Sequence, residues 1–367
     1  MIPKLSNTVS VTPPSIPRNS DLMQELLEQN FPRAYIPQLS YYAHGKFLIT
    51  GEYLLLHGAK SLSVPTKLGQ SLEMRKRESH NPKLFWRSLD KDGNIWFSAI
   101  FDLWHFNIEL GPQITKQHVS FQFLQNVLKQ SRLLNPHFLR DEHDIFVETK
   151  LEFPLEWGLG SSSSLVAMVA QWAQVGAFDL HQRVGHGSGY DVACAMAPGP
   201  ITYQLTKLEG QGKRPSWSIV PFSPRCKDQL YFVYQGNKQD TQKELVKFLQ
   251  RDFETKTLDQ YVLDVSQITE EMMVQEEIVD MQKLIKSHDQ ILSEVLGRPR
   301  LKDQLFSDFN GEIKPLGAWG GDFCFVASSL SDIETREYFL KKGHSIIFSF
   351  DEIVNFNLDH INAGRIH

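Results

Sequence analysis

The sequence predicts a two-domain chain that mixes helices with strands, and three observations lead to this prediction. Its 367 residues exceed the roughly 100 to 200 residues of one compact domain. A strand pattern, a glycine-rich loop and a helix pattern follow one another from residue 145 to residue 172. The C-terminal half then mixes helix and strand patterns, and 41% of the chain is hydrophobic, which is enough to bury a substantial core.

Composition and charge argue against several classes of protein. The 38 basic and 43 acidic side chains give a net charge of -5 without any long block of like charges, so neither nucleic acid nor a membrane is expected as a partner. No apolar run approaches the roughly 20 residues of a membrane span, and the N-terminus lacks the pattern of a secretion signal. The three cysteines are far apart, which disfavours a disulfide framework or a zinc site and favours a reducing, cytoplasmic setting: Cys194, Cys226 and Cys324.

Residues 1–40 are expected to form a flexible extension. They hold six of the eighteen prolines among Ser, Thr and Asn, a composition that supports little packing. A short helix from Asp21 to Asn30, with Asp21 as its N-cap, would be stable only if it docked on the rest of the protein.

Apolar patterns predict the elements of the first domain. Residues 47–49 and 53–56 are apolar runs separated by Gly51-Glu52, which predicts two strands joined by a turn. Alternate apolar positions from residue 145 to 153 predict a strand that Pro154 ends. Apolar residues at helical spacing from Leu165 to Trp172 then predict an amphipathic helix.

The second domain is expected to begin near residue 211. The polar, Gly- and Pro-bearing stretch from Leu208 to Ser216 is the best candidate for a boundary. Residues 229–234 form a strand pattern, and a helical pattern from Ile268 to Val295 ends at Gly297-Arg298-Pro299. The expected division is an extension of residues 1–40, domains of residues 41–210 and 211–350, and a tail of residues 351–367.

The glycine- and serine-rich run from Gly158 to Ser164 is a candidate phosphate site. It stands between a strand and a helix, where the first backbone N–H groups of the helix point toward any bound anion. Gly158 and Gly160 would let the backbone approach a phosphate, and the serine hydroxyls could bind its oxygens or Mg2+. A simple serine-capped connector is the alternative, and the run has neither P-loop nor dinucleotide-loop spacing.

A second run, Ser188-Gly189-Tyr190-Asp191-Val192-Ala193, presents an acid directly after a glycine turn. Asp191 could accept a proton from an attacking hydroxyl, or it could be a plain N-cap of the helix that follows. Two further runs are weaker alone. Lys46 precedes an apolar strand and could stabilise phosphate charge or be merely solvated. The run from Gly317 to Asp322 could be only the turn of a hairpin.

Together and in this order, these runs resemble the three sequence blocks of the GHMP kinases, over residues 41 to about 350. Gly45-Lys46 with Gly51-Glu52-Tyr53 is similar to the first block, Gly158-Leu159-Gly160-Ser161-Ser162 to the nucleotide loop, and Gly317-Ala318-Trp319-Gly320-Gly321 to the third. The Ser-Gly-Tyr-Asp run and the Gly-Gly-Asp ending at Asp322 look most like phosphomevalonate kinases and the Bacteroidetes-type GHMP kinases with a Gly-Tyr-Asp motif.

The resemblance implies an α+β fold of two domains, an N-terminal domain like the second domain of ribosomal protein S5 and a ferredoxin-like C-terminal domain, with the active site between them. It implies an ATP- and Mg2+-dependent kinase, with Asp191 as the catalytic acid/base and Lys46 as its cationic partner. The ATP phosphates would be bound by Gly158, Leu159, Gly160, Ser161, Ser162 and Ser163, and Mg2+ by Ser162. The acceptor would contact Glu52, Ser188, Gly189, Gly317, Gly320 and Gly321.

Two departures limit what the resemblance implies. Trp319 replaces a glycine usual in the third block, and Leu180 stands where mevalonate kinases place a Mg2+-binding glutamate, so that water and ATP oxygens are expected to complete the metal shell.

The expected acceptor is a small acidic metabolite, with phosphomevalonate or mevalonate as the first candidates. A phosphorylated acceptor needs cations, and those near the motifs in sequence are Lys67, Arg75, Lys76, Arg77 and His186. A sugar or homoserine-type kinase, or a non-catalytic nucleotide- or metabolite-binding protein, remains the alternative.

Overall fold

The structure is a computed structural model, which describes residues 31, 38–110, 116–140, 142–185, 187–208, 212–236, 248, 250, 255–317 and 322–356. The expected helix of residues 21–30, and all but two positions before residue 39, lie outside the described residues. Within the described part of the chain, no helix combines the length and apolar character that a membrane span requires.

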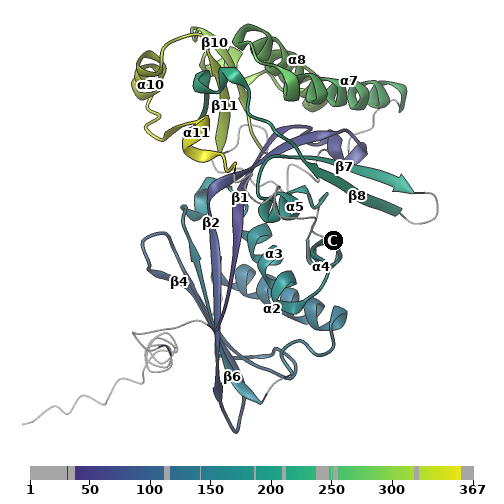
Figure 1. The fold of residues 1–367 in the computed structure, drawn as a ribbon, viewed down its shortest axis with the longest axis vertical. Helices are drawn as coiled ribbons and strands as arrows, with labels where there is room; N and C mark the ends of the chain where they lie inside the picture. The colour runs from purple at the N-terminus through teal and green to yellow at the C-terminus, as the bar shows by residue number, and fades with distance from the viewer. Residues whose placement is uncertain are drawn as a thin grey trace, which may run out of the picture.

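The first domain is built on an eight-stranded mixed sheet (Figure 1). The strand order is β5-β4-β3-β6-β2-β7-β8, and β1 pairs with β2 outside this path. Neighbouring strands are antiparallel except β3 and β6, which run parallel. The strands are β1 (Leu39–Thr50), β2 (Ser61–Glu78), β3 (Lys83–Leu89), β4 (Ile95–Asp102), β5 (Ile108–Leu110), β6 (His143–Leu151), β7 (Ile201–Leu208) and β8 (Gly212–Ile219).

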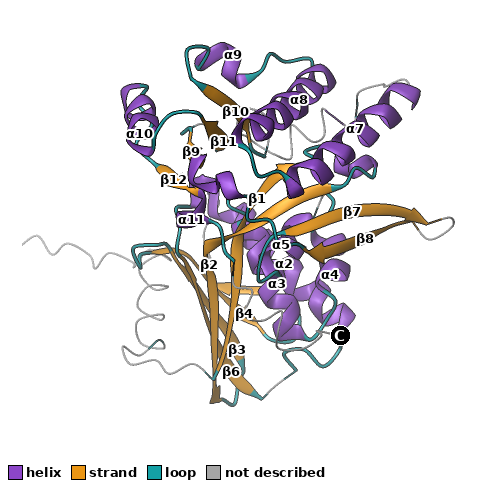
Figure 2. Ribbon diagram, turned by 45° about the horizontal axis from the view of Figure 1, so that its top comes forward, coloured by secondary structure: helices purple, strands orange, loops and turns teal. Residues whose placement is uncertain are grey.

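Four helices cover one face of this sheet (Figures 1 and 2). They are α2 (Lys116–Leu134), α3 (Ser161–Ala173), α4 (Ala177–Val184) and α5 (Tyr190–Met196). The alternation on β6 turns Ile145 and Val147 toward these helices, while Met168 and Val169 of α3 meet them in the same buried cluster. The strand and the helix predicted from these spacings are confirmed.

An aromatic cluster lies apart from the helix-packed core. Phe85, Ile100 and Phe146 form it, and the buried Phe31 packs among them. The Arg87 guanidinium lies 4.0 Å from the centre of the Phe31 ring, which adds a cation–π contact. Phe31, inside the expected flexible extension, therefore packs against the first sheet.

The second domain is a four-stranded antiparallel sheet in the order β10-β11-β9-β12. Its strands are β9 (Leu230–Tyr234), β10 (Gly311–Pro315), β11 (Phe323–Ser328) and β12 (Ile347–Ser349). Its helices are α7 (Thr255–Val274), α8 (Ile278–Leu296), α9 (Leu301–Leu305), α10 (Asp332–Lys341) and α11 (Phe350–Ile353), with a 3-10 helix η3 (Arg225–Gln229) before β9. This β-α-β-β-α-β order is ferredoxin-like, as predicted.

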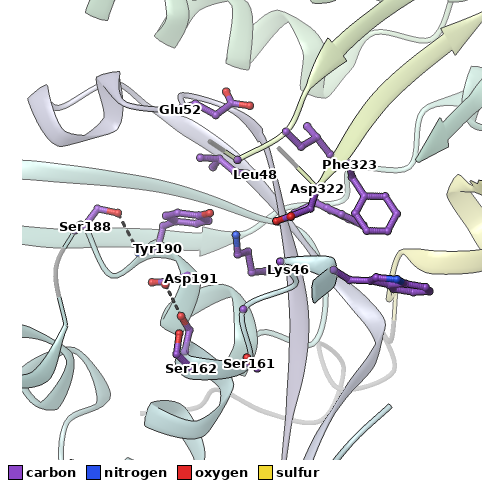
Figure 3. A pocket seen from close by; sticks show the side chains of 18 of the residues that line it. Lys46, Leu48, Glu52, Ser161, Ser162, Ser188, Tyr190, Asp191, Asp322 and Phe323 are labelled. Atoms are coloured by element: carbon purple, nitrogen blue, oxygen red, sulfur yellow. Dashed lines mark hydrogen bonds between the residues drawn. The ribbon is translucent and has the colours of Figure 1, made fainter. Parts of the chain in front are cut away.

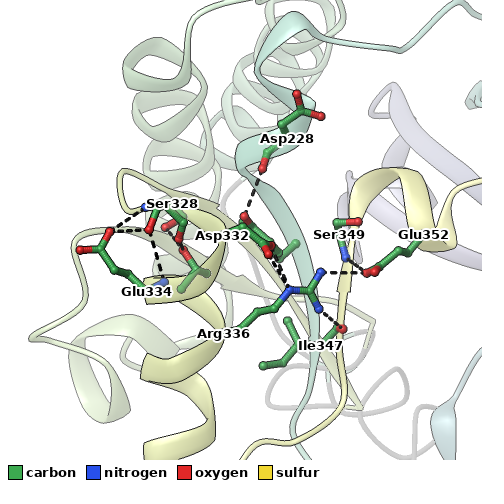
Figure 4. Close-up of polar contacts among 11 residues, drawn as sticks. Asp228, Ser328, Asp332, Glu334, Arg336, Ile347, Ser349 and Glu352 are labelled. Carbon is green, nitrogen blue, oxygen red and sulfur yellow. Dashed lines mark hydrogen bonds and ion pairs between the residues drawn. The ribbon is translucent and has the colours of Figure 1, made fainter.

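The outer edge of the second domain is held by a polar network around Arg336 (Figure 4). Its guanidinium donates to Asp332 on α10, to Glu352 on α11 and to the carbonyl of Ile347 on β12. The start of α10 is fixed by a capping box between Ser331 and Glu334. These contacts join α10, β12 and α11 into one unit.

The two domains share a hydrophobic core. Phe47 of β1 stacks on Phe232 of β9 with ring centres 4.5 Å apart, and Leu62 of β2 belongs to the same buried cluster. Alternation along β9 sends Phe232 into this interface and Val233 to the opposite face, against α10. Apolar side chains of both domains therefore form one continuous buried cluster where the domains meet.

The structure corrects three predicted elements. Residues 53–56 do not form a strand, because the chain turns at Gly51 and continues as a 3-10 helix η1 (Leu54–His57). The long helical pattern is two helices, α7 and α8, separated at residues 275–277. The stretch from Leu208 to Ser216 belongs to the β7–β8 hairpin, so the chain leaves the first sheet only after Ile219. The turn-forming residues that suggested a domain boundary there are instead part of a hairpin within the first sheet.

Candidate active site

A pocket of about 350 Å3 lies between the two domains (Figure 3). Both domains line it, because its walls include β1, the glycine loop and α5 from the first domain and the β10–β11 hairpin from the second. The pocket brings together most of the residues singled out in the sequence: Lys46, Glu52, Gly158, Gly160, Ser161, Ser162, Ser163, Ser188, Asp191 and Gly317.

The glycine loop has a backbone that only glycine adopts easily. Gly158 and Gly160 have φ angles of 65° and 90°, in the left-handed region. A Cβ atom at Gly158 would lie 1.6 Å from Oδ2 of Asp322, so any side chain at this position would have to displace the Asp322 carboxylate. The Lys46 N–H donates to the carbonyl of Leu159 at 3.0 Å, which fixes the loop on β1.

The four serines after the loop have different roles, although the sequence gives them equal weight. Ser162 is exposed and Ser161 is partly exposed at the start of α3, so their hydroxyls and the free N–H groups of the first turn can meet an anion. Ser163 is buried and its hydroxyl donates to Asp191. Ser164 is fully buried and donates to Gln70 Oε1 at 2.6 Å. Phosphate or Mg2+ would therefore be bound by the first two serines.

Asp191 lies in the first turn of α5, with its carboxylate in the pocket. The N-cap of α5 is Gly189, with a φ angle of 82°, so the N-cap interpretation of Asp191 is wrong. One carboxylate oxygen of Asp191, which Figure 3 labels, accepts from Ser163. The other accepts the Val192 N–H at 3.0 Å. These bonds hold the carboxylate in one orientation beside the glycine loop.

Lys46 is the cation beside this acid. Its ammonium lies 5.4 Å from the centre of the Tyr190 ring. Burial alone would lower the pKa of Lys46, but the Tyr190 hydroxyl and the Asp191 carboxylate beside it raise the pKa overall, so the side chain stays charged at neutral pH. Burial also raises the pKa of Tyr190, which keeps that hydroxyl protonated. The site thus combines a fixed cation, a carboxylate and a neutral phenol.

Glu52 was predicted to contact the acceptor, but its carboxylate is buried and paired with another side chain of the protein. It is 2% exposed, and its Oε1 accepts from Lys314 Nζ at 2.6 Å. Tyr53 next to it has φ 64° and ψ -50°, and the Leu54 N–H donates to the Glu52 carbonyl at 2.7 Å, which defines a γ-turn. The carboxylate therefore ties this strained turn to the second domain, although Glu52 also lines the pocket.

Other predicted site residues do not line the pocket. Leu159 is 1% exposed and belongs to the shared core, so its side chain is a packing group. Gly189 caps α5 from outside the pocket lining. Gly320 and Gly321 lie outside the described residues, together with Trp319 and His186.

The cations expected for a phosphorylated acceptor are also elsewhere. Lys67 donates to the Asp351 carbonyl, Arg77 pairs with Asp144 at 2.7 Å, and Arg75 lies over the ring of Phe146. The Lys76 N–H donates to Gln38, and neither this residue nor the other three lines the pocket. Of the described residues that line it, Lys46 is the only basic one.

The lining residues that were given no role from the sequence include Tyr190, Trp157 and Asp322. Tyr190 and Trp157 adjoin Asp191 and Gly158 in the chain, so the pattern of neighbours could have suggested them. Asp322 comes from the second domain, and only the Gly-Gly-Asp ending of the third block signals it.

The donor set is compatible with Mg2+ only if the nucleotide supplies ligands. Among the described residues, no cluster of three or more His, Cys, Asp or Glu side chains could hold a metal ion. Leu180 is fully buried in the first-domain core, as its apolar character requires. The exposed Ser162 hydroxyl, at the start of α3, fits a hard cation bound together with phosphate.

Comparison with known proteins supports the fold. Neither a protein-family model nor a curated protein matches the sequence. Among solved structures, mevalonate kinase from Methanococcus jannaschii is 14% identical with a TM-score of 0.62, covering 89% of this chain and 100% of that one. Phosphomevalonate kinase from Streptococcus pneumoniae, in complex with phosphomevalonate and AMPPNP, is 16% identical with a TM-score of 0.60, covering 85% and 100%.

A kinase for a sugar is similar to the same extent. Lactococcus lactis galactokinase complexed with galactose is 13% identical with a TM-score of 0.57, covering 92% of this chain and 98% of that one. The chain therefore has the two-domain GHMP kinase fold over nearly the whole length of these proteins, which confirms the fold expected from the sequence blocks.

Proposed function

We propose that this protein is an ATP-dependent kinase that transfers the γ-phosphoryl group of ATP to a small acidic metabolite, with mevalonate and phosphomevalonate as the first acceptors to test. Such an activity would belong to isoprenoid precursor synthesis. The observation that carries the proposal is the meeting of Asp191, Lys46 and the start of α3 in one pocket.

Each of these groups has a part in the transfer. The N–H groups at the start of α3, with the Ser161 and Ser162 hydroxyls, bind and orient the phosphates. Asp191 accepts the proton of the acceptor hydroxyl as the new O–P bond forms and the bond to the leaving ADP oxygen breaks. The Lys46 ammonium offsets the negative charge that develops on the transferred group. Mg2+, held with Ser162, would neutralise charge on the phosphate oxygens.

The charges of the pocket favour mevalonate over phosphomevalonate. A phosphate on the acceptor would add two negative charges, and Lys46 is the only cation among the described lining residues. One carboxylate on the acceptor needs less compensation. Apolar side chains that line the same pocket, such as Leu48, Leu55 and Leu316, suit a short hydrocarbon skeleton.

The test is ATP-dependent ADP formation with mevalonate, phosphomevalonate, galactose or homoserine as acceptor. We expect mevalonate to stimulate ADP formation in the native protein and Asp191→Ala to lower kcat by about 10²- to 10⁴-fold. Asp259→Ala, which removes an exposed carboxylate of α7, is the matched control and should leave kcat unchanged.

Other results would replace the proposal. Stimulation by galactose or homoserine alone would make the protein a sugar or alcohol kinase of this fold. If no acceptor stimulates ADP formation while AMPPNP still binds, the protein is a non-catalytic nucleotide-binding protein. Full activity in Asp191→Ala would show that another group accepts the proton.

A further inference from the structure

The Lys46 side chain reaches the pocket on a stem whose base is fixed (Figure 3). The pairing of β1 with β2 is irregular between His44 and Lys46, and the Lys46 N–H donates to the Leu159 carbonyl at 3.0 Å. Three side-chain carbons of Lys46 lie between 3.2 and 3.9 Å from the Cβ position of Gly160. Because the four-carbon stem is flexible, the position of its ammonium depends on the groups that it meets in the pocket.

The Tyr190 side chain lies at the end of this stem. Lys46 Nζ is 5.4 Å from the centre of the Tyr190 ring, and Figure 3 shows the oxygen end of the phenol directed toward that nitrogen. The hydroxyl can accept from the ammonium, and the ring adds a weaker cation–π attraction. Burial lowers the pKa of Lys46, whereas the Tyr190 hydroxyl and then the Asp191 carboxylate raise it, which agrees with a hydroxyl close to the ammonium.

Tyr190 is itself held firmly. It is the first residue of α5, directly after Gly189. Its ring packs against the buried cluster that contains Leu48 and Leu55. A Cβ atom at Gly189 would lie 2.9 Å from the ring of Phe178 on α4, so the start of α5 is packed closely against α4. The phenol therefore offers a fixed point of contact to a flexible ammonium.

A phenol can hold an ammonium without cancelling its charge. Burial raises the pKa of Tyr190, so that its hydroxyl stays neutral at pH 7. A carboxylate in the same place would offset the positive charge that the proposed function directs at the transferred phosphoryl group. The Asp191 carboxylate is already oriented by the Ser163 hydroxyl and the Val192 N–H. Tyr190 is the group placed to orient Lys46.

We propose that Tyr190 is a positioning residue that holds the Lys46 ammonium in place for phosphoryl transfer. The inference rests on the proposed function in taking Lys46 as the cation that stabilises the transferred group. The Tyr190 hydroxyl acts through Lys46. Without this hydroxyl, the ammonium can turn toward Asp191, and the buried amine gives up its proton more readily.

Substitution of Tyr190 tests the inference by separating kcat from nucleotide binding. Tyr190→Phe removes the hydroxyl and keeps the ring, whereas Tyr190→Leu removes both. With the acceptor that stimulates the native protein, we expect Tyr190→Phe to lower kcat about tenfold and Tyr190→Leu to lower it further. The affinity for AMPPNP, measured by isothermal titration calorimetry, should stay within about twofold of the native value. A purely structural role would weaken binding as well.

A double substitution and a control show whether the hydroxyl acts through Lys46. The effect of Tyr190→Phe on kcat should disappear in a Lys46→Met background, because the group that the hydroxyl holds is then absent. Tyr261→Phe is the matched control. It removes a hydroxyl that donates to Glu294 at 3.2 Å outside the pocket lining, and it should leave kcat unchanged.

A measurement on Lys46 itself does not depend on turnover. The native protein and Tyr190→Phe, labelled with 13C at the lysine ε-carbons, are titrated with base by NMR, and the Lys46 signal is assigned by its loss in Lys46→Met. We expect Lys46 to lose its proton at a lower pH in Tyr190→Phe, because burial lowers the pKa of Lys46 and the hydroxyl no longer opposes this effect. The other titratable groups around Lys46 remain in the variant: Asp191 and Cys194 on α5, Glu52 after β1, and Asp322, which lines the same pocket.

The outcomes separate the two proposals. If an acceptor stimulates the native protein but Tyr190→Phe has the native kcat, or lowers kcat equally with and without Lys46, the role of Tyr190 is refuted and the kinase assignment stands. An unchanged titration of Lys46 in Tyr190→Phe refutes that role equally. If no acceptor stimulates the native protein, the proposed function fails, and the titration alone decides whether Tyr190 holds Lys46.

Discussion

The buried ion pair between Glu52 and Lys314 allows a test of how strongly the second domain stabilises the turn at Glu52. Lys314 is fully buried on β10, and its ammonium donates to Glu52 Oε1 at 2.6 Å and to the Ile49 carbonyl. Lys314→Met keeps the length of the side chain but leaves the Glu52 carboxylate buried and uncompensated. Removal of one partner of a buried pair costs about 3–5 kcal/mol, so we expect a loss of about 4 kcal/mol in the free energy of unfolding.

The loss should depend on pH. Burial raises the pKa of Glu52, and Lys314 opposes this effect. Without Lys314 the pKa of Glu52 in the folded protein rises further, so the deficit is full above that pKa and shrinks as the pH falls and Glu52 takes up a proton. Urea unfolding followed by tryptophan fluorescence at pH 8 and about pH 5.5 measures both values.

The control and the refuting result are equally specific. Lys283 forms an exposed pair with Asp280 at 2.7 Å, and Lys283→Met should change stability by less than about 0.5 kcal/mol. A loss below about 1 kcal/mol in Lys314→Met would refute the reasoning, because the pair would then contribute no more than a surface pair. A deficit that does not shrink at low pH would show that Glu52 is not the group left uncompensated.

Three other predictions follow from single contacts. Phe31→Ala should lower the free energy of unfolding by about 3 kcal/mol in urea, without loss of ADP formation, because it empties the aromatic cluster. Gly158→Ala should weaken AMPPNP binding at least about tenfold by calorimetry, since its Cβ displaces Asp322 or the loop. His288→Gln should reduce the loss of stability below about pH 6.5 in urea melts, because burial holds the pKa of His288 well below its ordinary value and only the unfolded chain gains the proton.

Local sequence patterns predicted the part of the candidate site that the first domain contributes. The strand before Pro154, the glycines and the helix after them are neighbours in the chain, and each has a signature of spacing or backbone conformation. Asp191 was found for the same reason, because a glycine turn precedes it. Spacing could not separate the exposed Ser162 from the buried Ser164, since the difference depends on Gln70 of β2.

Apolar runs were misread where the backbone was unusual. Residues 53–56 have the composition of a strand, but the left-handed conformation of Gly51 and the γ-turn at Tyr53 redirect the chain into η1. The conformation is imposed from outside the segment. The Gly51 N–H donates to His288 Nε2 at 3.0 Å, and Thr50 shares a 2.7 Å hydrogen bond with Thr269. No pattern within residues 50–56 could reveal partners on α7 and α8.

Two of the contacts that sequence reasoning missed arise from a single hairpin. Lys314 lies near the end of β10 and Asp322 directly before β11, so the β10–β11 hairpin presents a cation to the Glu52 turn and a carboxylate to the Gly158 loop. The two strands thus carry contacts to both motifs of the first domain. Because the hairpin belongs to the second sheet, a shift between the domains would move Lys314 and Asp322 together. We infer that the ion pair at Glu52 helps to hold Asp322 at the glycine loop, a specific role for a buried charge pair.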